Sequence, residues 1–326
     1  MAVATLGLIL TLTCAACQGD GASPDSSAAS GPTSSLDGDA QSDTVIPEIR
    51  SEADIAVGRA FPLDAYALTD IQLTLISQAL NLLTSQCMTE QGFQLPARQT
   101  SETLPERNRL VSEFGVGILT EVQEYGYQIP PQYLGEKASA DSGTVQYSEA
   151  MIDALLGPVQ DRLAEPVIQV AGGEQDSGVS YAPQSCLRFA HEKLGIALER
   201  GAELSVGMGS AAVANLNVES RSRTQADPRV IQVTKDWSDC MAASGFNWPN
   251  PHEASSAGSS DDTALEIATA TADVRCKYDT NYFGVLYGVT VDYQQRLIDA
   301  DLAGLETLAD GNQDMLDKAN AVIQAG

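Results

Sequence analysis

The sequence has few basic residues, and this shortage limits what the protein can bind. Eighteen lysine and arginine residues stand against 44 aspartate and glutamate residues, which gives a formal net charge of −26. A surface of this sign repels other polyanions, so we expect no nucleic-acid partner. No cluster of basic residues is present to hold anionic lipid, so we expect any membrane attachment to be apolar or covalent.

Histidine and the common catalytic motifs are also scarce. His191 and His252 are the only histidines, and no His-Glu-x-x-His motif occurs, so an imidazole-rich metal site is hard to assemble. We expect both to be surface residues, His191 on a solvated helix face and His252 in a loop. The sequence contains no Gly-x-Ser-x-Gly motif of serine hydrolases, and none of the five lysines has a serine three residues before it. We therefore predict no catalytic residue, no metal site and no cofactor.

Two partial motifs are better explained without a ligand. Gly207-Met-Gly209-Ser-Ala-Ala212 resembles a dinucleotide loop, but no convincing strand precedes it. The segment Asp299–Asp310 partly matches a calcium loop, but Ala303 stands where an oxygen ligand is needed. Leucines and an isoleucine continue at helical spacing through the same segment. We expect a solvated acidic helix there.

The N-terminus has features of an exported, lipid-anchored protein. Residues Ala2–Ala16 carry no charge and are too few to span a bilayer, as in the apolar core of a signal peptide. They lead into Ala15-Ala16-Cys17, which is similar to a bacterial lipobox, in which Cys17 receives diacylglycerol and becomes the first mature residue. Cys14 stands where leucine is more usual, and no basic residue precedes the apolar run. Ordinary secretion with a free N-terminus is the alternative.

The composition after Cys17 predicts a tether followed by a helical domain. Gln18–Asp43 consists largely of small and polar residues, which is typical of a flexible solvated linker. Hydrophobic residues make up 43% of the chain, enough for a substantial core. We place the signal peptide at 1–16, the tether at 17–60 and the helical domain at 61–326, with halves at 61–224 and 225–326 as one way to divide it.

Apolar spacing predicts a mainly α fold. Thr69-Asp-Ile-Gln72 is a capping box at a helix start, and Leu73, Ile76, Leu80, Leu83 and Cys87 then share one face. Further helices are expected at Leu104–Tyr125, Glu149–Leu156, Ser185–Arg200, Pro228–Ser244 and, nearly continuous, Thr263–Ala325. The best strand candidate is Val167–Val170, and surface loops are expected at Gly135–Ser148, Gly172–Ser180 and Ser255–Asp262.

One ten-residue pattern, Cys-Met-x-x-x-Gly-Phe-x-x-Pro, occurs twice, starting at Cys87 and at Cys240. Its spacing is typical of a helix that ends in a Schellman motif, in which glycine at C′ adopts a left-handed conformation. Counting back from the glycine, the methionine falls at C3 and the phenylalanine at C″, the pair whose apolar contact accompanies this cap. The predicted cap residues are Met88, Gly92 and Phe93 in the first copy, and Met241, Gly245 and Phe246 in the second.

Four cysteines remain once Cys14 is removed and Cys17 is lipidated, and they allow three pairings. Each copy of the ten-residue pattern is followed by one more cysteine on an expected helix. We therefore predict the sequential disulfides Cys87–Cys186 and Cys240–Cys276, in keeping with export to an oxidising compartment. Each cysteine lies on an apolar helical stripe, so we interpret all four as structural.

Further segments from Cys87 onward carry a family resemblance. They are Tyr125-Gly-Tyr-Gln-Ile-Pro-Pro131, Trp237-Ser-Asp-Cys-Met241 with Gly245 and Pro249, Ala272-Asp-Val-Arg-Cys276-Lys277, and Tyr293-Gln294. With the repeated Cys-Met-x-x-x-Gly-aromatic segment, this layout resembles uncharacterised secreted proteins and lipoproteins of actinobacteria. The resemblance covers most of the mature chain. It implies export and the disulfide layout, and it implies no activity, substrate or cofactor.

Three functional hypotheses follow from the sequence. The leading one is a non-enzymatic binding or interaction module on the outer face of the cell membrane, anchored by lipid on Cys17, whose partner is an envelope protein, a glycan or a small ligand. The second is an envelope hydrolase that cleaves glycan or peptide with a carboxylate pair drawn from the 44 acidic residues. The third is a solute-binding lipoprotein, a class that usually alternates strands and helices in two lobes.

Overall fold

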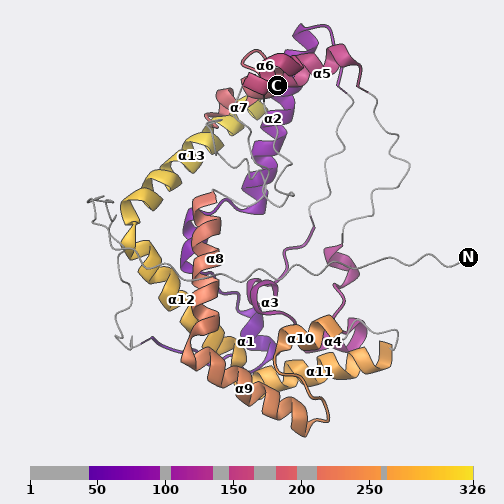
Figure 1. The fold of residues 1–326 in the computed structure, drawn as a ribbon, viewed down its shortest axis with the longest axis vertical. Helices are drawn as coiled ribbons and strands as arrows, with labels where there is room; N and C mark the ends of the chain where they lie inside the picture. The colour runs from indigo at the N-terminus through magenta and orange to yellow at the C-terminus, as the bar shows by residue number, and fades with distance from the viewer. Residues whose placement is uncertain are drawn as a thin grey trace, which may run out of the picture. The chain divides into compact units, whose positions relative to one another are not determined.

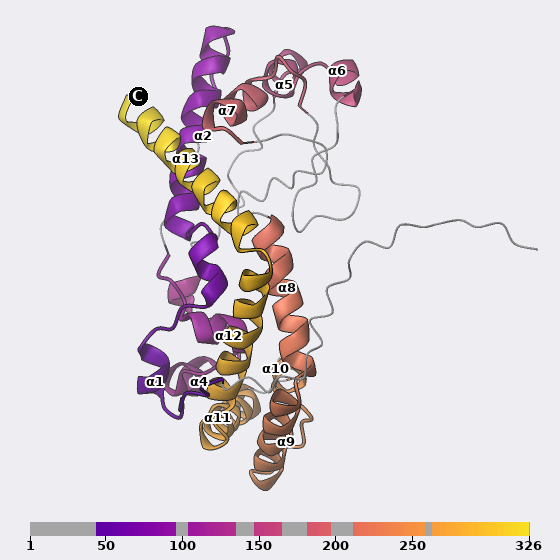
Figure 2. The same ribbon diagram turned by 90° about the vertical axis from the view of Figure 1, so that its left-hand side faces the viewer.

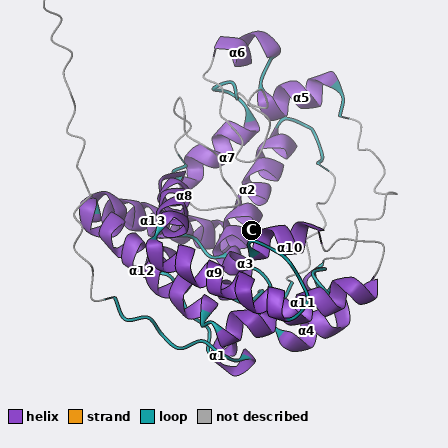
Figure 3. Cartoon of the chain, turned by 60° about the horizontal axis from the view of Figure 1, so that its bottom comes forward, coloured by secondary structure: helices purple, strands orange, loops and turns teal. Residues whose placement is uncertain are grey.

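The computed structural model describes residues 44–95, 104–134, 147–164, 181–196, 211–257 and 263–325. Every regular element within these ranges is a helix (Figure 3), which confirms the mainly α prediction. None of these helices is both long enough and apolar enough to cross a bilayer. Cys17, the signal peptide, the strand candidate Val167–Val170 and the loop at Gly172–Ser180 lie outside the described residues.

The helices in chain order are α1 Glu52–Ala56, α2 Asp70–Glu90, α3 Arg109–Phe114, α4 Leu119–Tyr125, α5 Glu149–Leu156, α6 Val159–Ala164, α7 Cys186–Leu194, α8 Ala211–Ala226, α9 Pro228–Ala243, α10 Pro251–Ala257, α11 Thr263–Asp279, α12 Tyr282–Ala300 and α13 Leu302–Ala325, with 3-10 turns η1 Pro62–Tyr66 and η2 Pro131–Tyr133 (Figure 1). The capping box at Thr69 is present, because its hydroxyl accepts from the Gln72 amide and the Gln72 side chain accepts from the Thr69 amide.

Several predicted helix boundaries were wrong because the chain turns where apolar spacing does not change. The helix expected over Thr263–Ala325 is three helices, divided at Asn281, which has a positive φ of 56°, and at Asp301. The helix expected over Leu104–Tyr125 is two, divided after Gly115 at a φ of 84°. The partial calcium motif Asp299–Asp310 therefore spans a helix junction and not one continuous helix.

Other segments are more, or less, helical than expected. Ser255 lies in α10, so the loop expected at Ser255–Asp262 was placed too early. α8 was not predicted, because its alanine, asparagine and serine residues give a weak apolar stripe. α7 stops at Leu194 before Gly195, which has a positive φ of 77°, and so ends earlier than the helix expected over Ser185–Arg200.

The folded domain begins well before residue 61, so the tether predicted for 17–60 is too long. Ile49 and Ile55 are fully buried. The backbone at Ile49 donates to the Asn281 Oδ1 atom at 2.8 Å, and the Asn281 Nδ2 atom donates to the Pro47 carbonyl at 3.0 Å. A Cβ on Gly284 of α12 would lie 2.0 Å from that carbonyl oxygen. Glycine at this place is what lets the strap 46–49 lie directly on α12.

The division into halves 61–224 and 225–326 does not describe the packing. α13, from the second half, packs along α2 and α7, from the first (Figure 2). Their shared core joins Ile76, Leu80 and Ala190 to Leu316 and Ala319. A second core surrounds Trp237, where α9, α11 and α12 meet. Contacts therefore connect the two expected halves.

Both repeated patterns end their helices as predicted. Gly92 and Gly245 have φ values of 85° and 91°. In the first copy the Phe93 amide donates to the Met88 carbonyl at 2.8 Å, and the Gly92 amide donates to the Thr89 carbonyl at 3.0 Å. The matching bonds in the second copy, from Phe246 to Met241 and from Gly245 to Ala242, are 2.9 and 3.1 Å. These are the two bonds that define a Schellman motif.

We expect Gly245→Ala to lower the free energy of unfolding by about 1–2 kcal/mol, because alanine is strained at this positive φ. Nothing lies within 4 Å of the added Cβ, so the effect reports backbone strain and not a clash. Gly311→Ala in α13 is the matched control, since its Cβ also meets nothing within 4 Å and its helical φ suits alanine. Urea denaturation should show the control unchanged or stabilised; equal losses in both variants would contradict the cap assignment.

The disulfides Cys87–Cys186 and Cys240–Cys276 are both present, as predicted. The first joins α2 to α7, and the second joins α9 to α11. Cys186 and Cys276 are buried in apolar clusters. The prediction held because each cysteine lies on the inner face of a helix that packs against its partner's helix.

His191 contradicts the expectation of a surface residue, because it is only 4% exposed. Its Nδ1 atom lies 2.6 Å from the Leu187 carbonyl oxygen, one helical turn earlier, and its ring stacks on Tyr181. Burial lowers the pKa of His191, and the bond to the Leu187 carbonyl only partly offsets that effect. His252 also differs from expectation: it is exposed, but it lies in α10 and not in a loop.

We expect His191 to make the protein less stable in acid. The unfolded-state pKa is about 6.5 and the folded-state pKa is lower, so the stability present above pH 6.5 is lost as the pH falls through the folded-state value. His191→Gln should flatten the dependence of unfolding free energy on pH in this window. His252→Gln, at the only other histidine, should leave it unchanged, and the reverse result would refute the assignment.

Candidate functional site

A cavity of about 700 Å³ lies where five helices approach the turn between α3 and α4. Its walls come from this turn, the C-terminal end of α8, and α9, α10, α11 and α12 (Figure 1). Ligand pockets for small molecules usually have volumes in this range. Phe114, Val230 and Leu286 of the wall belong to one apolar cluster, and most of the other lining residues are polar or charged.

Two buried charges of α11 form the floor of the cavity. Asp273 and Lys277 are one helical turn apart, their Oδ2 and Nζ atoms are 3.2 Å apart, and each side chain is 1% exposed. Lys277 also donates to the Val116 carbonyl at 3.0 Å, and the Trp237 indole donates to Asp273 Oδ1 at 2.9 Å. The pair therefore joins the α3–α4 turn and α9 to α11.

Burial opposes the charged form of both partners. It raises the pKa of Asp273 and lowers the pKa of Lys277, and in each case the partner's charge acts in the opposite direction. Because each group has the other and one further hydrogen bond, we take the pair as ionised at neutral pH. Removing either partner would leave a charge with no compensation in this interior.

Two tyrosines on the cavity wall remain protonated at neutral pH. Burial and then the Asp273 charge raise the pKa of Tyr127, and burial raises the pKa of Tyr282 to about 12. The Tyr127 hydroxyl is buried next to Asp273, whose hydrogen bond with it also opposes loss of its proton, although the contact falls outside normal hydrogen-bond geometry. Asp273 is therefore the first acceptor for this hydroxyl.

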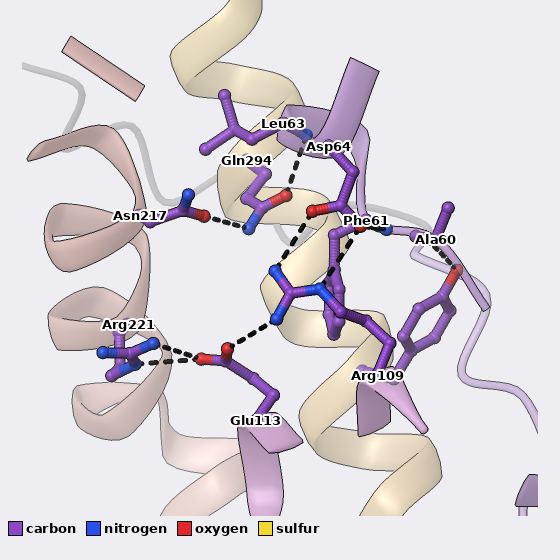
Figure 4. A network of polar contacts seen from close by, with 10 residues as sticks. Ala60, Phe61, Leu63, Asp64, Arg109, Glu113, Asn217, Arg221 and Gln294 are labelled. Atoms are coloured by element: carbon purple, nitrogen blue, oxygen red, sulfur yellow. Dashed lines mark hydrogen bonds and ion pairs between the residues drawn. The ribbon is translucent and has the colours of Figure 1, made fainter. Parts of the chain in front are cut away.

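Alternating charges extend from the cavity edge into the fold (Figure 4). Arg221 of α8 contacts Glu113 of α3 at 2.8 Å, and the other Glu113 oxygen accepts from Arg109 at 3.3 Å. Arg109 in turn contacts Asp64 of η1 at 3.1 Å. Two basic and two acidic residues thus balance, so the Arg221 charge at the cavity wall is compensated.

Arg107 differs from the other charged residues of the cavity wall. It precedes α3, and its Nε atom is buried without a hydrogen-bond partner among the described residues. No ion pair joins it to a carboxylate in the same part of the chain. With Lys277 paired to Asp273 and Arg221 to Glu113, the charged groups on the wall sum to one positive charge, which Arg107 supplies.

Comparisons with protein-family models, with curated proteins and with solved structures find no match to this chain.

The residues singled out from the sequence are mostly elsewhere. None of the six cap residues and none of the disulfide cysteines lines the cavity, whereas His252 does. Among the described residues no three histidine, cysteine, aspartate or glutamate side chains are grouped to hold a metal.

Sequence reasoning missed Arg107, Tyr127, Asp273 and Lys277. One pattern could have indicated the last two, because they share a helix face with the buried Cys276 and so place charge on the core side of α11. Arg107 and Tyr127 reach the cavity from segments outside α11, before α3 and after α4. No sequence periodicity connects Arg107 or Tyr127 to the cavity.

Chemically, the arrangement provides apolar surface together with hydrogen-bond donors. The two acidic residues of the cavity wall are already engaged, Asp273 with Trp237 and Lys277, and Glu113 with Arg109 and Arg221. The charged group left for a ligand is the Arg107 guanidinium. A guanidinium is suited to hold a molecule by its acceptor atoms.

Proposed function

We propose that the protein is a lipid-anchored binding protein of the cell envelope, which holds a small molecule in the cavity between α8 and α12. The observation that carries this proposal is the cavity itself, with about 700 Å³ of volume and a buried donor, Arg107 Nε, left without a partner. A hydrolase with two working carboxylates has less support, because both acidic residues on the wall are neutralised by basic neighbours. The all-helical fold differs from the strand–helix alternation usual in solute-binding lipoproteins.

The location outside the cytoplasm is supported by chemistry. Two disulfides indicate an oxidising environment. The apolar N-terminal run that ends at Cys17 supports lipid attachment, and the resemblance to actinobacterial lipoproteins supports export. Intact mass of the membrane-fraction protein should show diacylglycerol on Cys17, and Cys17→Ala should release the domain into the medium. Retention of that variant in the membrane fraction would contradict lipid attachment at Cys17.

Ligand binding can be tested by filling the cavity. Ser255 of α10 lines the cavity and is half-buried, whereas its neighbour Ser256 is exposed and does not line it. We expect small-fragment hits, detected by ¹⁹F NMR, to bind the wild type and Ser256→Trp and to be lost in Ser255→Trp. Melting curves would establish that both variants are folded. Hits that persist equally in Ser255→Trp would place binding elsewhere and contradict the proposal.

A further inference from the structure

The charge of the cavity and the charge of the whole protein have opposite signs. The chain carries a formal charge of −26, yet the charged side chains of the cavity wall leave one positive charge at Arg107. Acidic residues are not scarce, so a carboxylate beside Arg107 would have been easy to supply. A guanidinium whose Nε atom is buried and unpartnered lacks a hydrogen bond that such groups nearly always have.

We infer that the natural ligand is a small organic acid, whose carboxylate or similar anionic group binds Arg107 while its apolar body lies against Phe114, Val230 and Leu286. The inference rests on the proposed function and names the class of its ligand. A carboxylate supplies two acceptor oxygens to the planar guanidinium, and the paired bonds are stronger than bonds between neutral groups. One of them would satisfy the buried Nε atom.

Tyr127 lines the same cavity as Arg107, but its hydroxyl already faces an acceptor. Burial raises the pKa of Tyr127, and the charge and the hydrogen bond of Asp273 raise it further. Asp273 also accepts from Trp237 and pairs with Lys277. The acidic group of this wall therefore has its own donors, and Arg107 is the donor left for an anion.

The large negative charge of the protein does not prevent anion binding in the cavity. At physiological ionic strength the interaction between exposed charges is largely screened beyond about 8 Å. The other charges on the cavity wall are paired, and a direct contact between Arg107 and a ligand anion is much shorter than this screening length. The local charge therefore decides which ligands enter, and the net charge affects mainly the rate of approach.

Benzoate and benzamide form the test, because they have nearly the same shape and differ in charge. The Arg107 Nε–H resonance and the tyrosine ring resonances report binding in NMR titrations. We expect the wild type to bind benzoate at least tenfold more tightly than benzamide, with the Arg107 resonance shifting only for benzoate. Arg107→Gln should bind both probes equally, at the affinity of benzamide for the wild type. Arg275→Gln, at an exposed arginine of α11 outside the cavity wall, should keep the preference.

The outcomes separate the inference from the proposed function. Equal binding of both probes to the wild type would overturn the anion assignment and leave a binding cavity. A preference for benzoate that survives in Arg107→Gln would assign the anion to another residue and overturn the role of Arg107. If the resonances respond to neither probe and fragments bind Ser255→Trp as well as the wild type, the cavity is not a ligand site. That result would overturn both the proposed binding function and the anion inference.

Discussion

Replacing Cys87 and Cys186 together by alanine lowers the free energy of unfolding by about 4–5 kcal/mol, the largest loss we expect from any change to this chain. The disulfide closes a loop with a sequence separation of 99 residues, and the entropy of the unfolded chain rises most when a long loop is released. Alanine is preferred to serine because Cys186 is fully buried and a serine hydroxyl would lack a partner in its apolar cluster. Urea denaturation followed by tryptophan fluorescence measures the loss.

The second disulfide serves as the control for this prediction. Cys240–Cys276 closes a loop with a separation of 36 residues, so its double alanine variant should lose about 0.9 kcal/mol less by the same loop-length relation. Reducing both disulfides of the wild type should lower the free energy of unfolding by the sum of the losses of the two double alanine variants. A larger loss from the shorter loop would show that local packing, and not loop length, determines what the disulfides contribute.

Asp273→Asn lowers the free energy of unfolding by about 3–5 kcal/mol, because it leaves the Lys277 charge buried without a counter-ion. Asparagine has nearly the same shape and still accepts from the Trp237 indole, so the loss reports charge and not a void. The double variant Asp273→Asn/Lys277→Met should recover most of it, since methionine fills similar volume without a charge. Denaturation of the two single variants and the double variant gives the coupling between the residues.

An exposed pair with the same i, i+4 spacing provides the control for Asp273. Lys235 and Asp239 on α9 are also one turn apart, but their side chains are 66% and 67% exposed. Water already solvates both charges, so Asp239→Asn should leave stability nearly unchanged. Equal losses at Asp239 and Asp273 would contradict the claim that burial of the pair causes the effect.

The parts of the fold that sequence could predict are those fixed by short-range rules. A methionine four residues before a glycine and a phenylalanine directly after it specify a Schellman motif at Gly92 and at Gly245 without any knowledge of the fold. The capping box at Thr69 is equally local. The disulfides were predicted from the order of the cysteines, because each copy of the ten-residue pattern is followed by one more cysteine on an expected helix.

The remaining features depend on contacts that no spacing reveals. Apolar residues continue through Asn281 and Asp301, so hydrophobic periodicity misses both turns. Burial of His191 depends on Tyr181 and on packing between α7, α2 and α13. The cavity forms only where six separate segments of the chain meet. Arg107 can be recognised as unpaired only when the ion pairs of the other charged wall residues are known.

The strap 46–49 on α12 has a mechanical consequence for a protein held at its N-terminus. Tension from an attachment upstream of residue 44 would reach α12 through this strap, where Asn281 accepts from the Ile49 amide and donates to the Pro47 carbonyl. α12 also lines the cavity. We therefore expect a pull on the N-terminal segment to act on a wall of the cavity and to change ligand affinity.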